Sequence, residues 1–140
     1  MRISKKTQYG LRAMVYLANP QLKNRVYPLK KISQDEGIPF DFLGKIFSKL
    51  GKANLVSAKK GVQGGYLLSK NPQKIRVGEI VRILEGTMAP VFCIAKEREK
   101  RFFCPRSETC PTKNVWKKIQ EILNSTLNSI TLKDLVRSRK

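Results

Sequence analysis

The sequence predicts a mainly α-helical protein with one small β-hairpin. Three observations support this fold class. Apolar residues recur at helical spacing in several separate segments, two short β-type runs flank a glycine-rich turn, and the longest helical pattern lies near the C-terminus. With 140 residues, of which 41% are hydrophobic, the chain can form one domain with an appendage.

Three helices are expected in the first part of the chain, over residues 4–19, 29–36 and 39–50. Gly37 is expected to end the second helix, and Gly51 the third. The apolar stripe of the third helix consists of Phe40, Leu43, Phe47 and Leu50. A helix, a short helix, a tight turn and another helix follow one another in the order of a helix-turn-helix.

A β-hairpin is expected directly after these helices. The runs LVSAKK and YLLSK are of β type, and GVQGG between them is a turn. A hairpin in this position is a wing, so the predicted fold is a winged helix-turn-helix. Lys59 and Lys60 precede the tip of the wing, where a phosphate or a minor groove would be met.

The longest helix is expected over residues 112–129, and its apolar seam is wide for a helix at the end of a small domain. Packing on its own domain is one interpretation. We favour pairing with a second copy, because no later segment is large enough to cover the seam. The expected dimerisation residues are Val115, Trp116, Ile119, Ile122, Leu123, Leu127 and Ile130. Thr131 is expected to cap a last short helix, TLKDLV.

The chain is therefore expected to have three parts. Residues 1–86 form the winged helix-turn-helix domain and include a further helix over 77–85. Residues 87–111 form a loop without clear periodicity, and residues 112–140 form the dimerisation helix and tail.

The formal net charge of +19 is extreme for this length, and both halves of the chain are basic. Such a charge favours a polyanion, either nucleic acid or an anionic membrane surface, over the alternative of a lysine-rich solvated surface. No apolar run could span a bilayer, and no signal peptide is recognisable, so we expect a cytoplasmic protein without a membrane partner. The chain has no histidine, no phosphate-binding loop and no paired carboxylates in a suitable context, so we expect no enzyme.

Double-stranded DNA is the polyanion that a helix-turn-helix with a wing would bind. The helix over residues 39–50 places polar side chains opposite its apolar stripe, as major-groove recognition requires. Any single lysine is more often a solvated charge than a contact to a base. The candidate DNA-binding residues are Arg2, Ser4, Lys5, Lys31, Asp41, Lys45, Ser48, Lys49, Lys59, Lys60 and Gln63.

Cys93, Cys104 and Cys110 are the only cysteines, and they fall within 18 residues. Clustered cysteines in a cytoplasmic protein indicate metal binding or redox chemistry before structural disulfides. Zinc sites usually contain a C-x2-C pair, which is missing here. Thiols at wider spacing favour an iron–sulfur cluster, with a thiol switch and a zinc site as alternatives. Three thiolates leave one ligand of a four-ligand site unassigned.

These segments together resemble the Rrf2 (Rrf-two) family of winged helix-turn-helix transcriptional regulators, the group of IscR, NsrR and CymR. The opening MRISKKTQYGLRAMVYLA is similar to the family's first helix, and IPFDFLGKIFSKLGKANLVSAKKGVQGGYLLSK to its recognition helix and wing. VGEIVRILEG and NVWKKIQEILNSTLNSITLKDLV are similar to the next helix and the dimerisation helix. The resemblance covers nearly the whole chain and is strongest for the cluster-containing members.

The resemblance implies a homodimeric regulator, expected to be a repressor, that binds a near-palindromic operator and has no small-molecule substrate. It also implies that Cys93, Cys104 and Cys110 hold an iron–sulfur cluster, with 2Fe–2S favoured over 4Fe–4S. The state of the cluster would gate DNA affinity in response to iron–sulfur status, redox conditions or nitric oxide.

The chain departs from the family pattern at several positions. Lys113 replaces a histidine that follows the third cysteine in some members, and Gln8 stands where others have an aspartate ligand in the partner's first helix. Gln8 and Glu108 are therefore the candidates for the fourth ligand. Gly44 replaces a polar residue of the recognition helix. A regulator without a cluster, switched by a Cys104–Cys110 disulfide, is the alternative interpretation.

Overall fold

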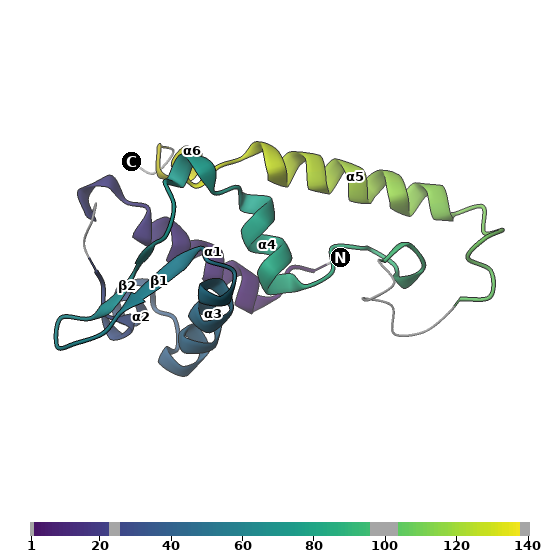
Figure 1. The fold of residues 1–140 in the computed structure, drawn as a ribbon. Helices are drawn as coiled ribbons and strands as arrows, with labels where there is room; N and C mark the ends of the chain where they lie inside the picture. The colour runs from purple at the N-terminus through teal and green to yellow at the C-terminus, as the bar shows by residue number, and fades with distance from the viewer. Residues whose placement is uncertain (1, 23–25, 96–103, 138–140) are drawn as a thin grey trace.

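The computed structural model describes residues 2–22, 26–95 and 104–137. Residues 96–103 of the predicted cysteine loop therefore lie outside the described residues. The helices are α1 (Lys5–Leu17), α2 (Leu29–Glu36), α3 (Phe40–Lys52), α4 (Val77–Glu85), α5 (Lys113–Ser129) and α6 (Leu132–Arg137), with 3₁₀ turns η1 (Pro20–Leu22), η2 (Pro72–Lys74) and η3 (Phe92–Ile94). The strands β1 (Val56–Lys59) and β2 (Gly65–Leu68) complete the fold (Figure 1).

Helices α1 to α3 and the β-hairpin form the predicted winged helix-turn-helix. Strands β1 and β2 pair antiparallel, with Val56 opposite Leu68 and Lys59 opposite Gly65. The hairpin extends beyond the helices as a wing (Figure 1). Tyr27, in the segment before α2, exchanges two backbone hydrogen bonds of 3.0 and 2.8 Å with Tyr66 of β2. This bridge, which joins the wing to the segment ahead of α2, was not predicted from the sequence.

The core lies where α1, α3 and α4 meet, and the C-terminal α6 packs against α1. Leu43, Phe47 and Leu50 are fully buried, as their helical spacing predicts. Phe40 was expected on the same stripe, but its side chain is 52% exposed. It is the first residue of α3, so it precedes the part of the helix that reaches the core. The other fully buried large side chains include Met14, Ile32, Ile46, Ile80, Leu84 and Leu132.

Helix α3 does not end at Gly51, as the sequence predicted, but continues to Lys52. Gly51 lies within the helix, and the chain turns at Asn54, whose φ of 60° is left-handed. Asparagine tolerates this conformation because its short polar side chain hydrogen-bonds locally. Gly37 and Gly86 do end α2 and α4, with φ of 64° and 88°.

Helix α4 lies between α1 and α5 (Figure 1). A Cβ atom at Gly10 of α1 would overlap Leu84 of α4, so glycine is what allows these two helices to approach closely. On its other side, Arg82 of α4 donates a 2.8 Å hydrogen bond to the side-chain oxygen of Asn128 in α5. Helix α4 therefore contacts both α1 and α5.

The C-terminal helix α6 returns to the winged domain. Thr131 and Asp134 cap it reciprocally, with N–H to oxygen distances of 3.0 and 3.3 Å. Leu132 is fully buried in the domain core, and its N–H donates to the carbonyl of Ile75 at 3.0 Å. The predicted cap by Thr131 is confirmed. The division into parts at residues 86 and 111 stays a prediction. Within the described residues no helix is long and apolar enough to cross a membrane.

Glu85, the last residue of α4, holds the beginning of α1. Its carboxylate accepts hydrogen bonds from the hydroxyls of Thr7 (2.5 Å) and Ser4 (2.8 Å) and from the Ser4 N–H. Burial by itself would raise the pKa of Glu85, but these hydrogen bonds, with a smaller contribution from the charge of Lys6, hold it below its ordinary value. The carboxylate also suits the positive end of the α1 dipole.

Replacing Glu85 by Gln is expected to destabilise the protein at neutral pH by about 1–2 kcal/mol, because hydrogen bonds to a charged acceptor are lost. A lowered folded-state pKa contributes stability above the unfolded value of about 4.3, and that contribution disappears as pH falls through the folded pKa. Urea unfolding from pH 7 to pH 3 should therefore show the two proteins converging in acid. Glu121→Gln, on the exposed side of α5, serves as the control and should not change the midpoint. If the difference in free energy of unfolding between wild type and Glu85→Gln does not change with pH, the charged carboxylate is not the source of this stability.

Candidate nucleic-acid interface and cysteine segment

The exposed side of α3 carries the polar residues that the sequence selected. Asp41, Lys45, Ser48 and Lys49 are all exposed. They lie opposite the buried Leu43 and Phe47, on a side of the helix that the core does not cover. The predicted arrangement of an apolar inner stripe and a polar outer face is therefore confirmed, whereas contacts of these residues with DNA stay a prediction.

The wing presents a second basic surface. Lys59 ends β1, and Lys60 and Gln63 lie in the turn beyond it, all three exposed. The turn is closed by a 3.0 Å hydrogen bond from the N–H of Gly64 to the carbonyl of Gly61, whose φ of 119° favours glycine. A tight turn of this kind holds Lys60 and Gln63 at a defined place near the tip of the wing.

The remaining DNA-binding candidates lie on other elements. Lys31 of α2 is exposed and pairs with Asp35 at 3.2 Å. The Lys5 ammonium lies 5.9 Å from the centre of the Tyr9 ring. Arg2 precedes α1. Ser4 caps α1 and donates its hydroxyl proton to Glu85, so its side chain already has a structural role.

Lys6, which the sequence analysis did not select, lies beside Lys49. The interaction with the Lys49 side chain, with partial burial and charge repulsion, holds the pKa of Lys6 below its ordinary value. The two lysines come from α1 and α3, 43 positions apart, so no local sequence pattern could have paired them. Two ammonium groups held together are a place where a phosphate would relieve repulsion.

The three cysteines lie on the segment that joins α4 to α5. Cys93 is in η3, and Cys104 and Cys110 are at the two ends of a turn before α5. All three are free thiols and partly exposed. Three accessible thiols are a donor set that suits iron–sulfur chemistry. Among the residues that the structure describes, however, no three potential ligands are gathered in a metal-binding arrangement.

Cys110 is placed where a thiolate is stabilised. Its sulfur lies 3.1 Å from the hydroxyl of Thr112, just before α5 begins. Hydrogen bonds from the Thr112 side chain and backbone, and then from the Lys113 N–H, hold the pKa of Cys110 below its ordinary value. A thiolate is the form that binds metal and that attacks a disulfide, so this setting favours both chemistries.

The two candidates for a fourth ligand are both exposed. Gln8 lies on α1 and donates a 2.8 Å hydrogen bond from its amide nitrogen to the carbonyl of Ile3. That bond orients the amide and leaves its oxygen as the possible ligand atom. Glu108 lies in the turn between Cys104 and Cys110. The structure does not test either role.

Helix α5 keeps much of its apolar seam accessible. None of its residues is fully buried. Val115 and Ile122 are 53% and 58% exposed. The other expected dimerisation residues are half-buried, namely Trp116, Ile119, Leu123, Leu127 and Ile130. The helix thus packs partly on its own chain, as the first interpretation of the seam held, and leaves one apolar edge open.

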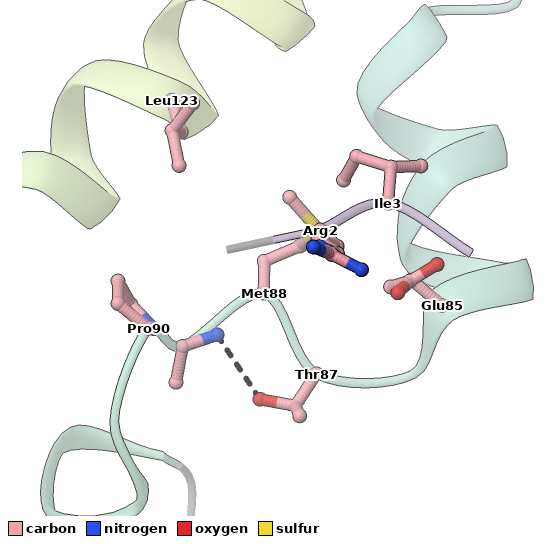
Figure 2. A pocket seen from close by; sticks show the side chains of 8 residues that line it. Arg2, Ile3, Glu85, Thr87, Met88, Pro90 and Leu123 are labelled. Carbon is pink, nitrogen blue, oxygen red and sulfur yellow. Dashed lines mark hydrogen bonds between the residues drawn. The ribbon is translucent and has the colours of Figure 1, made fainter.

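A cavity of about 110 Å³ lies where the cysteine segment begins. Figure 2 shows Met88 and Pro90 of this segment opposite Leu123 of α5, with Arg2 and Glu85 on the other side. The N–H of Ala89 donates to the Thr87 hydroxyl at 3.1 Å, which shapes the turn. The segment therefore leaves α4 between α5 and the residues ahead of α1.

The sequence and the fold of this chain are similar to those of known transcriptional regulators. A family model described as "Rrf2: Iron-dependent Transcriptional regulator" matches residues 3–138. The chain is 34% identical to the HTH-type transcriptional regulator IscR of Yersinia enterocolitica over 139 residues, 99% of this chain and 81% of that protein. The T. potens IscR structure is 31% identical, with a TM-score of 0.76 over 100% of this chain and 89% of the other. The structure of CymR, the global cysteine regulator of B. subtilis, is also 31% identical, with a TM-score of 0.81 over 100% and 99%. The winged helix-turn-helix fold and these matches along its whole length show that the chain belongs to the Rrf2 family of transcriptional regulators.

Proposed function

We propose that this regulator is a homodimer whose affinity for an operator is set by an iron–sulfur cluster on Cys93, Cys104 and Cys110. The observation that carries the proposal is the position of the cysteines, on the segment between α4 of the winged domain and the long helix α5. A group bound there would pull on α5 at one end and on α4 at the other.

The DNA-binding part of the proposal rests on charge and shape. Helix α3 and the wing place exposed lysines on neighbouring elements, and the chain carries a net charge of +19. An α-helix with polar side chains fits the major groove, and a basic wing fits the phosphate backbone or minor groove beside it. Two such units in a homodimer would match the two halves of a near-palindromic operator.

Replacing Lys49 by Ala is expected to lower affinity for every duplex and to reduce the slope of log K against log salt by about 1, because one phosphate contact is lost. The measurement is fluorescence anisotropy with a promoter duplex and a scrambled duplex over a range of salt. Lys74→Ala removes the same charge from η2, outside α3 and the wing, and should leave the slope unchanged. Equal effects of the two substitutions would mean that Lys49 acts only through bulk charge.

The homodimer part rests on the open edge of α5. Val115 and Ile122 are seven residues apart, so they lie on one side of the helix and would be buried together by a second α5. The polar side of the same helix, with Lys117 exposed, would remain in water.

Ile122→Asp is expected to weaken self-association by at least tenfold, because a charge would be buried without a partner. Sedimentation velocity over a range of protein concentrations would measure this. Lys117→Gln makes the same change in net charge about 140° around the helix from Ile122, and it should sediment like the wild type. A dimer that tolerates Ile122→Asp would show that this edge of α5 is not the interface.

The cluster part rests on the donor set. When bound, the cluster would supply a redox-active and oxygen-sensitive centre. Cys110 would bind readily because its surroundings favour the thiolate. Gln8 of the partner subunit or Glu108 would be the oxygen ligand. A movement of α5 would act on α4 through the Arg82–Asn128 hydrogen bond. It would then act on α1 through the close approach of Leu84 to Gly10.

Protein purified without oxygen, or reconstituted with iron and sulfide, is expected to be coloured and to contain both elements. Cys93→Ala should remove the colour, and Ser107→Ala, a loop substitution that removes no thiol, should retain it. Gln8→Ala and Glu108→Ala would identify the oxygen ligand by a changed absorbance spectrum. Colourless, iron-free protein after reconstitution would exclude the cluster.

A thiol switch is the second candidate, favoured by the similarity to a structure described as the oxidized form of Staphylococcus aureus CymR. Cys104 and Cys110 lie at the two ends of one short turn, and the pKa of Cys110 is lowered. An oxidant would remove two electrons and two protons as the sulfur–sulfur bond forms. Mass spectrometry of the oxidised protein would detect a linked Cys104–Cys110 peptide if this switch operates, and its absence would reject it.

A further inference from the structure

Phe40 is an exposed aromatic residue at the beginning of the helix that faces DNA in the proposed function. Its side chain is 52% exposed, whereas Leu43 and Phe47 of the same helix are fully buried. It is the first residue of α3 and precedes the exposed Asp41. An aromatic ring at this place contributes little to the core, and its exposure to water is unfavourable.

Phe42, the neighbouring exposed aromatic residue, has a structural partner. Its ring packs edge-on against Tyr9 of α1, with 5.6 Å between the ring centres. Residues two positions apart on a helix point to different sides, so Phe40 does not share this contact with α1. Phe42 is therefore explained by packing between α1 and α3, and Phe40 is not.

The side of α3 that carries Phe40 has no hydrogen-bonding side chain in the next two turns, because Leu43, Gly44 and Phe47 occupy it. Pro39 precedes Phe40, and Gly44 follows one turn later without a side chain. A Cβ atom at Gly44 would meet only Leu29, at 3.7 Å, so no bulky side chain covers the helix backbone here. Such a surface allows an apolar group to approach the ring closely.

The N-terminal residues of a recognition helix are those that approach base edges. In the major groove the apolar group on a base edge is the methyl group of thymine, and phenylalanine is one of the side chains that contacts it. Lys45, exposed further along α3, supplies positive charge that would hold the helix against the phosphates.

We propose that Phe40 recognises thymine methyl groups in the major groove of the operator. This inference rests on the proposed DNA-binding function and adds to it the chemistry of base selection. The chain would choose among sequences partly by an apolar contact, where Gly44 offers no hydrogen bond of its own.

The test uses the full-length chain and an operator that it selects from a random pool of duplex DNA. Each thymine of the selected site is replaced in turn by deoxyuridine, which differs only by the missing methyl group. Wild-type affinity is expected to fall about fourfold at each thymine that Phe40 contacts, as burial of about one methyl group predicts. Phe40→Ala should bind the thymine and uracil duplexes equally, and Phe40→Leu should retain most of the difference.

Val62→Ala is the matched control, since Val62 is a fully exposed apolar residue at the tip of the wing. It should discriminate thymine from uracil as the wild type does. Equal thermal melting of Phe40→Ala and wild type would show that the fold is kept. If the wild type binds its selected site well above random DNA but ignores the loss of every methyl group, the role of Phe40 is wrong and the proposed function stands. If the wild-type protein selects no site from the random pool, the role of Phe40 and the proposed operator binding are both wrong.

Discussion

Leu84 of α4 occupies the space over Gly10 of α1, and a Cβ atom at that glycine would collide with it. The close approach joins α4 to the helix that packs against α3, so the position of the recognition helix depends on α4. Helix α4 also contacts α5, because Arg82 of α4 donates a hydrogen bond to Asn128 of α5. Helix α4 therefore contacts both the winged domain and α5, through close packing on one side and a side-chain hydrogen bond on the other.

Glu85 adds a second connection at the end of α4. Its carboxylate binds the hydroxyls of Ser4 and Thr7 and so holds the first turn of α1, where Lys6 and Lys49 also lie close together. An acidic group and two basic groups thus stand within one small region of a very basic protein. The acid stabilises the beginning of the helix, and the lysine pair keeps a repulsion that a phosphate would relieve.

The cysteine segment is attached to this framework at both ends, through α4 and α5. Cys110 lies beside the first N–H groups of α5, which favour a thiolate. A bound metal and a disulfide would each use that thiolate, and each would change the path of the chain into α5. The two proposed switches therefore differ in their chemistry but would act on the same helix.

The sequence by itself determined the order of the elements, because hydrophobic periodicity, turn glycines and helix caps are local. It predicted α1 to α4, the wing, α5 and the capped α6, and it found the exposed polar face of α3. It erred at the end of α3, because nothing local distinguishes a glycine within a helix from one that ends it. The tertiary structure decided the contacts between residues that are far apart in the sequence. The contact of Thr7 with Glu85 spans 78 positions, and the pairing of Lys6 with Lys49 and the exposure of Phe40 depend on how separate helices pack. No local sequence pattern encodes these features, since each depends on which helices the folded chain brings together.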